Sequence, residues 1–486
     1  MTKKNILRLM VLITIYVFSG PAFSQNGYKI EVAVSGFSGN EAYLAYYYGD
    51  KQYIKDTAAA QNGSFVFEGP EALDGGIYLI VLPPKNSYFE IIIDKDQKFK
   101  LATDTVDYVK HMKVSGSEEN DYFYKDIQFL AVKRVRANEI NASLKDPGIG
   151  AVEAKKLNDE LSGIDGEVKA FRKKFMQEHP DLFYVKVLES MEEPVIPEAP
   201  KDENGKTLDS LFAYKYYRAH YFDHLDLKDD RMLRTPILHN KVEQYMERLV
   251  PKHPDSINIA LDYIIDKSRG SEDIFQYLVV NQLNKYAGSK IMGMDGVYVH
   301  LVEKYYMSGE AWWADEETIK KMEERALALS PNLVGRPAPN FRAQDSNGNY
   351  RDLYGVEAEF TLLYFWDYDC GHCKKITPKL AEAYKRYKDH DVALFAVSIN
   401  GDVEVWKKKL QEYGLQDAIN VQDHYRRSGF DKMYDIRSTP RLFILDENKK
   451  IIAKQISVSQ MEEILSTELG LPMPEKTHED ESEGEE

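Results

Sequence analysis

Both cysteines of this 486-residue chain lie in one short segment that directly follows an apolar run. The run, FTLLYFW at 360–366, has the unbroken apolar character of a central strand that is covered on both faces. Cys370 and Cys373 come next, and residues with helical spacing follow them. A strand that leads through two thiols into a helix is the feature that most restricts the fold of this chain.

The spacing of the two cysteines favours thiol chemistry over a structural disulfide. A bridge between them would close a very short loop, and the stabilisation from a disulfide grows with loop length. Cys370 is expected at the N-terminus of the helix, where unpaired backbone N–H groups and the helix dipole favour the thiolate. Cys373, one helical turn further on, can then resolve a mixed disulfide. Gly371 and His372 separate the two, and His372 is a nearby cation.

A metal site is the weaker interpretation of these residues. A zinc site would need further ligands, and the chain has no third cysteine to join Cys370 and Cys373. The spacing of His220 and His224 predicts two imidazoles on one helical face, but Tyr221 stands where zinc hydrolases carry a glutamate base. We therefore predict a structural or surface role for these histidines. No metal and no cofactor beyond the Cys370–Cys373 disulfide are expected.

The two ends of the chain predict export and a solubilising tail. Basic residues among the first eight positions precede an apolar stretch that runs to about Phe18, and small residues at Ala22 and Ser24 form a cleavage site. We predict a signal peptide at 1–24, a periplasmic location, and no membrane span after cleavage. The acidic segment 473–486 is predicted to be disordered. The formal net charge of -16 argues against a nucleic-acid partner.

The sequence pattern changes along the chain and predicts three folded domains. Residues 27–115 contain short runs rich in Val, Ile, Tyr and Phe between turns, as in an antiparallel β sandwich or small barrel. Residues 118–330 have apolar residues at helical spacing and predict an all-α domain, interrupted by a loop at 192–208. Residues 334–472 alternate strands and helices and end in an antiparallel strand pair, which predicts an α/β layered sheet.

Three motifs in the last domain resemble the exported thioredoxin-like proteins of the TlpA/ResA type: VGRPAPNF, YFWDYDCGHCKKITP and STPRLFILD. The resemblance implies a thioredoxin fold in which Pro440 is cis and lies against the two sulfurs. It also implies that the backbone of Thr439 pairs with an incoming substrate and that Pro378 kinks the active-site helix. The candidate site residues are Trp366, Cys370, Gly371, His372, Cys373, Thr439 and Pro440.

The resemblance implies an exported thiol–disulfide oxidoreductase in which Cys370 attacks and Cys373 resolves. Its partners would be the thiols and disulfides of client proteins, together with a membrane or periplasmic redox partner. Proteins with a similar arrangement of β-rich, helical and thioredoxin-like domains are exported oxidoreductases whose N-terminal parts have no known function.

Several positions depart from the family pattern. The dipeptide between the cysteines is that of protein disulfide isomerases, and in those proteins its histidine makes the pair more oxidising. Tyr364 stands where thioredoxins have a buried carboxylate, and Ile376 stands where ResA-like proteins have a glutamate. The proton acceptor for the resolving cysteine is therefore not identified. Asp367 and Asp369 would raise the thiol pKa if they are close and ionised, so the direction of electron flow stays open.

Other functions remain possible alongside the reductant interpretation. The pair could act as a disulfide isomerase or oxidant, or the first two domains could make the protein a client-binding scaffold in which the dithiol is secondary. A peroxidase is less compatible, because peroxidases with a similar entry motif need a threonine where this chain has Asp367.

Overall fold

The computed structural model describes residues 27–474. The predicted signal peptide and the acidic tail from residue 475 onward lie outside the described residues. The chain divides into two compact units, residues 1–242 and 243–486, which are described separately here. No helix within residues 27–474 combines the length and the apolar character that crossing a membrane requires.

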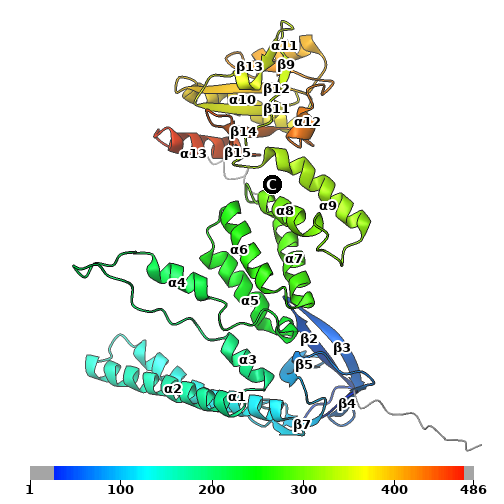
Figure 1. Ribbon diagram of the computed structural model, residues 1–486, viewed down its shortest axis with the longest axis vertical. Helices are drawn as coiled ribbons and strands as arrows, with labels where there is room; N and C mark the ends of the chain where they lie inside the picture. Colours follow the sequence, from blue (N-terminus) through cyan, green and yellow to red (C-terminus); the bar gives the residue numbers. More distant parts are fainter. Residues whose placement is uncertain (1–26, 475–486) are drawn as a thin grey trace, which may run out of the picture. The chain divides into compact units, whose positions relative to one another are not determined.

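Two four-stranded sheets form the β-rich part of the first unit (Figure 1). Their strands are β1 (Tyr28–Ser35), β2 (Glu41–Tyr48), β3 (Lys51–Ala59), β4 (Ser64–Gly69), β5 (Gly76–Leu82), β6 (Ser87–Ile93), β7 (Lys98–Asp104) and β8 (Lys113–Ser115). The orders are β4-β1-β7-β8 and β3-β2-β5-β6. Buried and exposed residues alternate along β1, β4 and β7, as expected of strands with one face in a core. The predicted β-rich fold is confirmed, but β1 and β7 pair in parallel, so the first sheet is mixed.

Helices complete the first unit. They are α1 (Glu118–Leu144), α2 (Ala151–Glu178), α3 (Phe183–Ser190), α4 (Phe212–His220), η1 (Asp230–Arg234) and α5 (Pro236–Gln244). Figure 1 shows α1 and α2 as an antiparallel pair. Ser117 caps α1, and the buried side chain of Asn120 exchanges two hydrogen bonds with the backbone of Ile92 on β6. These two polar contacts fix the start of α1 against the second sheet.

The predicted helical placement of the two histidines is wrong. Helix α4 ends at His220, so His224 lies beyond it in a turn and not on the same helical face. His220 instead pairs with Asp223 through Nδ1 and Oδ2 at 2.6 Å. The helix ends at His220, and the carboxylate of Asp223 in the turn that follows is the partner of its imidazole.

The second unit begins with the remaining helices of the predicted helical domain, so that domain contributes to both units. They are η2 (Tyr245–Leu249), α6 (Pro254–Lys267), α7 (Glu272–Ala287), α8 (Asp295–Leu301), η3 (Val302–Tyr306), α9 (Glu316–Leu329) and η4 (Ser330–Asn332). Ser271 caps α7 and Asp315 caps α9, each accepting a backbone hydrogen bond in the first turn. These side chains satisfy backbone N–H groups that the start of each helix leaves without an intrahelical partner.

A seven-stranded sheet with helices against it forms the rest of the second unit (Figure 1). Its elements are β9 (Arg342–Gln344), β10 (Tyr350–Asp352), η5 (Leu353–Gly355), β11 (Phe360–Trp366), α10 (Gly371–Tyr387), β12 (Val392–Ser398), α11 (Val403–Glu412), β13 (Ile419–Gln422), α12 (Phe430–Met433), β14 (Arg441–Leu445), β15 (Ile451–Lys454) and α13 (Val458–Glu468). The order is β10-β9-β13-β12-β11-β14-β15. This mixed α/β sheet agrees with the predicted thioredoxin fold.

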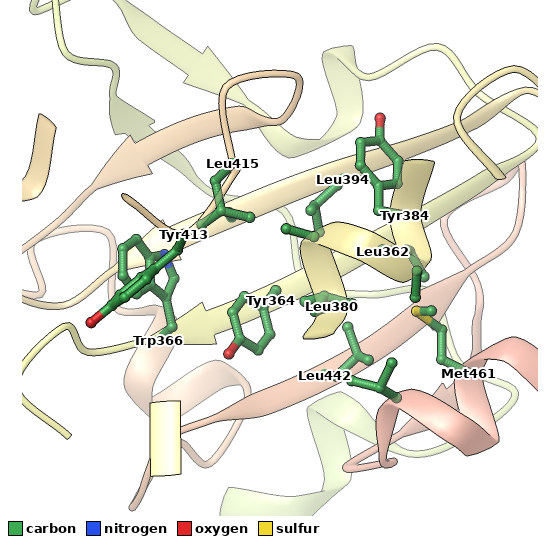
Figure 2. Close-up of a cluster of buried hydrophobic side chains, with 14 of the residues drawn as sticks. Leu362, Tyr364, Trp366, Leu380, Tyr384, Leu394, Tyr413, Leu415, Leu442 and Met461 are labelled. Carbon is green, nitrogen blue, oxygen red and sulfur yellow. The ribbon is translucent and has the colours of Figure 1, made fainter. Parts of the chain in front are cut away.

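The central strand β11 is buried along its whole length, which explains its unbroken apolar sequence. Leu362, Tyr364 and Trp366 belong to one core cluster, and Leu363 and Phe365 belong to a second cluster on the opposite face. Figure 2 shows the first cluster, in which the side chains of β11 meet those of α10, β12, β14 and α13.

The topology gathers four loops at one edge of the sheet. Strands β11, β12 and β13 run in parallel, so their carboxyl ends meet at this edge. Strand β14 is antiparallel to β11, so its first residue, Arg441, lies there too, paired with Phe365. Open α/β sheets place their functional residues at such an edge. The cysteines follow β11, and Pro440 directly precedes β14.

Candidate active site

Cys370 lies at the start of helix α10, where the sequence pattern had predicted it. It is the N-cap residue, with extended backbone angles of φ -67° and ψ 129°, and its carbonyl accepts from the N–H of Lys374 at 3.1 Å. Burial opposes ionisation of this partly exposed thiol. Hydrogen bonds from the backbone N–H and thiol of Cys373 and from the backbone N–H of His372 outweigh that effect, and the pKa of Cys370 lies below its ordinary value.

Cys373 has the opposite environment, although it lies one turn away. Its side chain is fully buried, and burial raises the pKa of its thiol to about 12. The backbone N–H of Asp367 points at its sulfur at 3.4 Å. Both cysteines are free thiols in this structure. One sulfur is therefore partly exposed with a lowered pKa, and the other is enclosed with a raised pKa.

The loop before β14 lies against the accessible sulfur. The peptide bond between Thr439 and Pro440 is cis, as the resemblance implied. The thiol of Cys370 donates to the carbonyl oxygen of Thr439 at 3.3 Å. Thr439 thus presents its backbone directly beside Cys370.

The remaining candidate residues lie either at the exposed start of α10 or in the core below it. Gly371 and His372 are exposed in the first turn of α10, at the mouth of the site. Trp366 is fully buried beneath it, and within the described residues its indole N–H has no hydrogen-bond partner. Pro378 lies inside α10, as expected. The structure thus brings Cys370, Cys373 and Thr439 into contact.

A hydroxyl pair takes the place of the buried carboxylate of the family pattern. The side-chain oxygens of Tyr364 and Thr377 lie 2.9 Å apart, and both residues are fully buried. Burial raises the pKa of Tyr364 further above its ordinary value, so this phenol stays neutral. No negative charge from either hydroxyl is therefore available below Cys373 at neutral pH.

Sequence reasoning missed Asn400, which contacts the turn in front of Cys370. Its side chain donates to Asp367 Oδ1 at 2.8 Å and to Asp369 Oδ2 at 3.4 Å, and it accepts from the N–H of Tyr368 at 3.0 Å. One signal could have found it: Asn400 follows β12, whose carboxyl end is adjacent to that of β11.

The structure offers no alternative metal centre among residues 27–474. Within this range no group of three or more His, Cys, Asp or Glu side chains is arranged to hold a metal ion.

Comparisons with known proteins agree with this geometry. Residues 358–451 match a family described as thioredoxin-like, and residues 28–123 and 171–329 match two domains of unknown function, DUF4369 and DUF5106. The thiol–disulfide oxidoreductase ResA of Bacillus subtilis (strain 168) is 27% identical over 143 residues, which is 29% of this chain and 78% of that protein.

Two solved structures are also similar. A domain of a possible thiol–disulfide isomerase from Cytophaga hutchinsonii is 37% identical, with 29% of this chain and 95% of that chain covered and a TM-score of 0.27. A thioredoxin-like protein from Bacteroides caccae is 20% identical, with 57% and 99% covered and a TM-score of 0.42. The C-terminal part of the chain is a thioredoxin-like domain related to the ResA thiol–disulfide oxidoreductases, and it follows regions that match DUF4369 and DUF5106.

Proposed function

We propose that the protein is an exported thiol–disulfide oxidoreductase that exchanges disulfides with client proteins through Cys370 and Cys373. The observation that carries this proposal is the asymmetry of the pair. Cys370 is accessible and its pKa is lowered, whereas Cys373 is fully buried and its pKa is raised to about 12. An attacking thiol must ionise and reach its substrate, and a resolving thiol must wait until the mixed disulfide has formed.

The reaction follows from these positions. The thiolate of Cys370 attacks one sulfur of a client disulfide, and the other client sulfur leaves as a thiolate that takes up a proton. Cys373 then loses its proton and attacks Cys370, which releases the second client thiol. The client gains two electrons and two protons, and the protein ends with a Cys370–Cys373 disulfide. The reverse sequence would oxidise a client dithiol.

Thr439 contributes binding in this scheme. Its carbonyl accepts a hydrogen bond from Cys370 only while that thiol is protonated, since a thiolate has no proton to donate. An extended client segment can add its backbone at this position, which would place a disulfide next to the attacking sulfur. Clients are therefore expected to bind through backbone contacts beside Pro440, with a membrane or periplasmic partner returning the pair to its starting redox state.

The reduction potential of the pair tests this proposal and decides the direction of electron flow. The full chain would be equilibrated in glutathione buffers, and the oxidised fraction read by alkylation and mass spectrometry. A potential near or below about -270 mV supports a reductant supplied with electrons by a membrane donor. A potential between about -180 and -120 mV supports an isomerase or oxidant. A pair that exchanges with neither glutathione nor a protein disulfide contradicts the enzymatic proposal.

Two further outcomes separate the alternatives. If a Cys370→Ala chain keeps its cellular role, the protein acts as a client-binding scaffold and the dithiol is secondary. Export is tested by the N-terminus of the protein recovered from its native cells. A mature chain that begins at Gln25 in the periplasmic fraction supports export, and an intact N-terminus in the cytoplasm contradicts it.

A further inference from the structure

Two carboxylates lie on the short turn between β11 and Cys370. Asp367 and Asp369 both belong to this turn, and the backbone N–H of Asp369 donates to Asp367 Oδ1 at 2.7 Å. Negative charge close to a sulfur disfavours its thiolate form. A chain that uses Cys370 as a nucleophile therefore has to control where these two carboxylates lie.

Asn400 binds the whole turn through one side-chain amide. Its Nδ2 donates to Asp367 Oδ1 at 2.8 Å and to Asp369 Oδ2 at 3.4 Å, and its Oδ1 accepts from the N–H of Tyr368 at 3.0 Å. Three consecutive residues are thus held by one side chain. The amide donates to both acidic groups, so it compensates part of their charge and fixes their orientation.

Asn400 is itself held by the sheet and not by the active-site turn. The backbone carbonyl oxygen of Asn400 accepts a hydrogen bond from Gln422 Nε2 at 2.5 Å. Its backbone N–H donates to the hydroxyl of Ser398 at 3.4 Å. Ser398 is fully buried at the end of β12, and Gln422 ends β13. In addition, the hydroxyl of Tyr368 accepts from the N–H of Asp402 at 3.3 Å. The edge of the sheet therefore holds Asn400 in place, and Asn400 positions the turn that carries Asp367 and Asp369.

The same turn contacts the backbone of Cys370 and the sulfur of Cys373. The backbone N–H of Asp367 points at Cys373 Sγ at 3.4 Å, and the carbonyl of Asp367 accepts from the N–H of Cys370 at 3.2 Å. A change in the position of Asp367 therefore alters the environment of both cysteines. Asn400 reaches the redox pair only through this residue and its neighbours.

We propose that Asn400 is a positioning residue whose amide binds the carboxylates of Asp367 and Asp369 and so limits the negative potential that they place on the sulfur of Cys370. The inference rests on the proposed function, which gives Cys370 the attacking role. Without the amide, the two carboxylates keep their charge, lose a shared donor and move more freely around the sulfur. The thiolate of Cys370 is then less favoured, and attack at neutral pH is slower.

The segments around Cys370 also carry other charged side chains. They remain unchanged when Asn400 is substituted, so their contributions cancel between the variants. These groups are His372, Lys374, Lys375, Asp402, His424, Arg437 and Arg441.

The test measures ionisation of Cys370 directly. The full chain has two cysteines, so in a Cys373→Ser background iodoacetamide reports on Cys370 alone. In this background, Asn400→Ala is expected to shift the midpoint of the rate–pH profile upward by about half a pH unit, which slows alkylation at pH 7 about threefold. The plateau rate at high pH is expected to stay the same, because access to the sulfur is unchanged.

Asn400→Asp is the second variant. It keeps an acceptor for the N–H of Tyr368 but replaces the donor with a third negative charge, so its midpoint is expected to rise further than that of Asn400→Ala. This variant decides the outcome if the alanine chain does not fold. Asn420→Ala is the matched control, since the Asn420 side chain also donates hydrogen bonds through Nδ2, but to the backbone carbonyls of Leu415 and Ala418 and not to the cysteine turn. Its profile is expected to coincide with that of the parent.

Removal of the carboxylates completes the test. In an Asp367→Asn/Asp369→Asn background, Asn400→Ala is expected to leave the midpoint unchanged, because no charge remains for the amide to compensate. A shift that persists in this background overturns the inference, as does an Asn400→Asp profile that coincides with the parent. Alkylation needs no client, so failure of the proposed function appears separately, as absent exchange with protein disulfides while the alkylation profiles still respond.

Discussion

The hydroxyl groups of Tyr364 and Thr377 lie 2.9 Å apart in the core below the redox pair, and Thr377 is one helical turn beyond Cys373. Both side chains are fully buried. A neutral hydrogen-bonded pair therefore occupies the place that a carboxylate has in thioredoxins. It holds strand β11 to helix α10 without placing a charge beside the resolving thiol.

Replacing Tyr364 by Phe is expected to destabilise the second unit. The change removes one buried hydrogen bond and leaves the hydroxyl of Thr377 without this partner, which costs about 1–3 kcal/mol in the free energy of unfolding. Urea denaturation, monitored by circular dichroism, measures this change in the free energy of unfolding. Tyr425→Phe is the control, because Tyr425 is 74% exposed, and it is expected to change stability by less than about 0.5 kcal/mol. Equal effects of the two substitutions contradict the assigned role.

The two thiols are expected to react with iodoacetamide at very different rates. The pKa of Cys370 is lowered, and burial raises the pKa of Cys373 to about 12, so Cys370 carries the larger thiolate fraction. Peptide mapping of the reduced, folded chain after brief alkylation at pH 7 should find the label on Cys370. In denaturant the selectivity should disappear. Comparable labelling of both cysteines in the folded chain rules out the asymmetry.

The raised pKa of Cys373 also predicts how stability depends on pH. A thiol whose pKa is higher in the folded state stabilises that state fully below its unfolded pKa of about 8.5. This contribution is lost as the pH rises through the folded value, about 12. The reduced chain should therefore lose stability between these values, and a Cys373→Ala chain should lose less. Denaturant titrations at pH 7 and 10 compare the two, and parallel losses count against the assignment.

Cys373→Ser is expected to trap a client. Cys370 can still attack, but no second thiol is present to release the mixed disulfide, so covalent adducts accumulate and disappear on treatment with dithiothreitol. Non-reducing electrophoresis of the protein from its native compartment detects them. Cys370→Ser is the control and should give none, because Cys373 is fully buried. Adducts in that control, at a similar level, would reverse the assigned roles.

His372→Ala is expected to make the pair more reducing. A positive charge on an imidazole in the first turn of α10 would favour the thiolate of the reduced form, and an interaction of about 1 kcal/mol corresponds to about 20 mV for two electrons. The potential should therefore fall by roughly this amount in a glutathione titration. His390→Ala, an exposed histidine beyond the far end of the same helix, should leave it unchanged. A rise in potential for His372→Ala would contradict the electrostatic role.

Lys454 joins the sheet to the preceding helices within the second unit. Its side chain is 6% exposed. The ammonium group contacts the carboxylate of Asp295, the carbonyl of Asn332 at 3.0 Å and Asn332 Oδ1 at 2.7 Å. Lys454→Met leaves Asp295 without its cation and is expected to cost about 3 kcal/mol in the free energy of unfolding. The double variant with Asp295→Asn should recover part of that loss, and strictly additive losses would show that the pair is not coupled.

Local signals in the sequence were enough for much of the candidate site. The apolar run 360–366 and the position of Cys370 at a helix start each depend on a few neighbouring residues, and each has the predicted structure. The predicted placement of His220 and His224 on one helical face was wrong because it depended on helical spacing alone. A helical spacing pattern does not reveal where a helix ends, and α4 stops at His220.

Tertiary structure alone decided which distant residues meet. The parallel pairing of β1 with β7, the contact of Lys454 with Asp295, and the position of Asn400 beside Asp367 all depend on strand register and packing between segments far apart in the chain. By itself the sequence determined where the two cysteines lie, at the start of a helix and one turn into it, because capping and periodicity act over single turns. Tertiary structure decided which groups surround the two sulfurs, because the parallel strands bring the carboxyl ends of separate segments to one edge of the sheet.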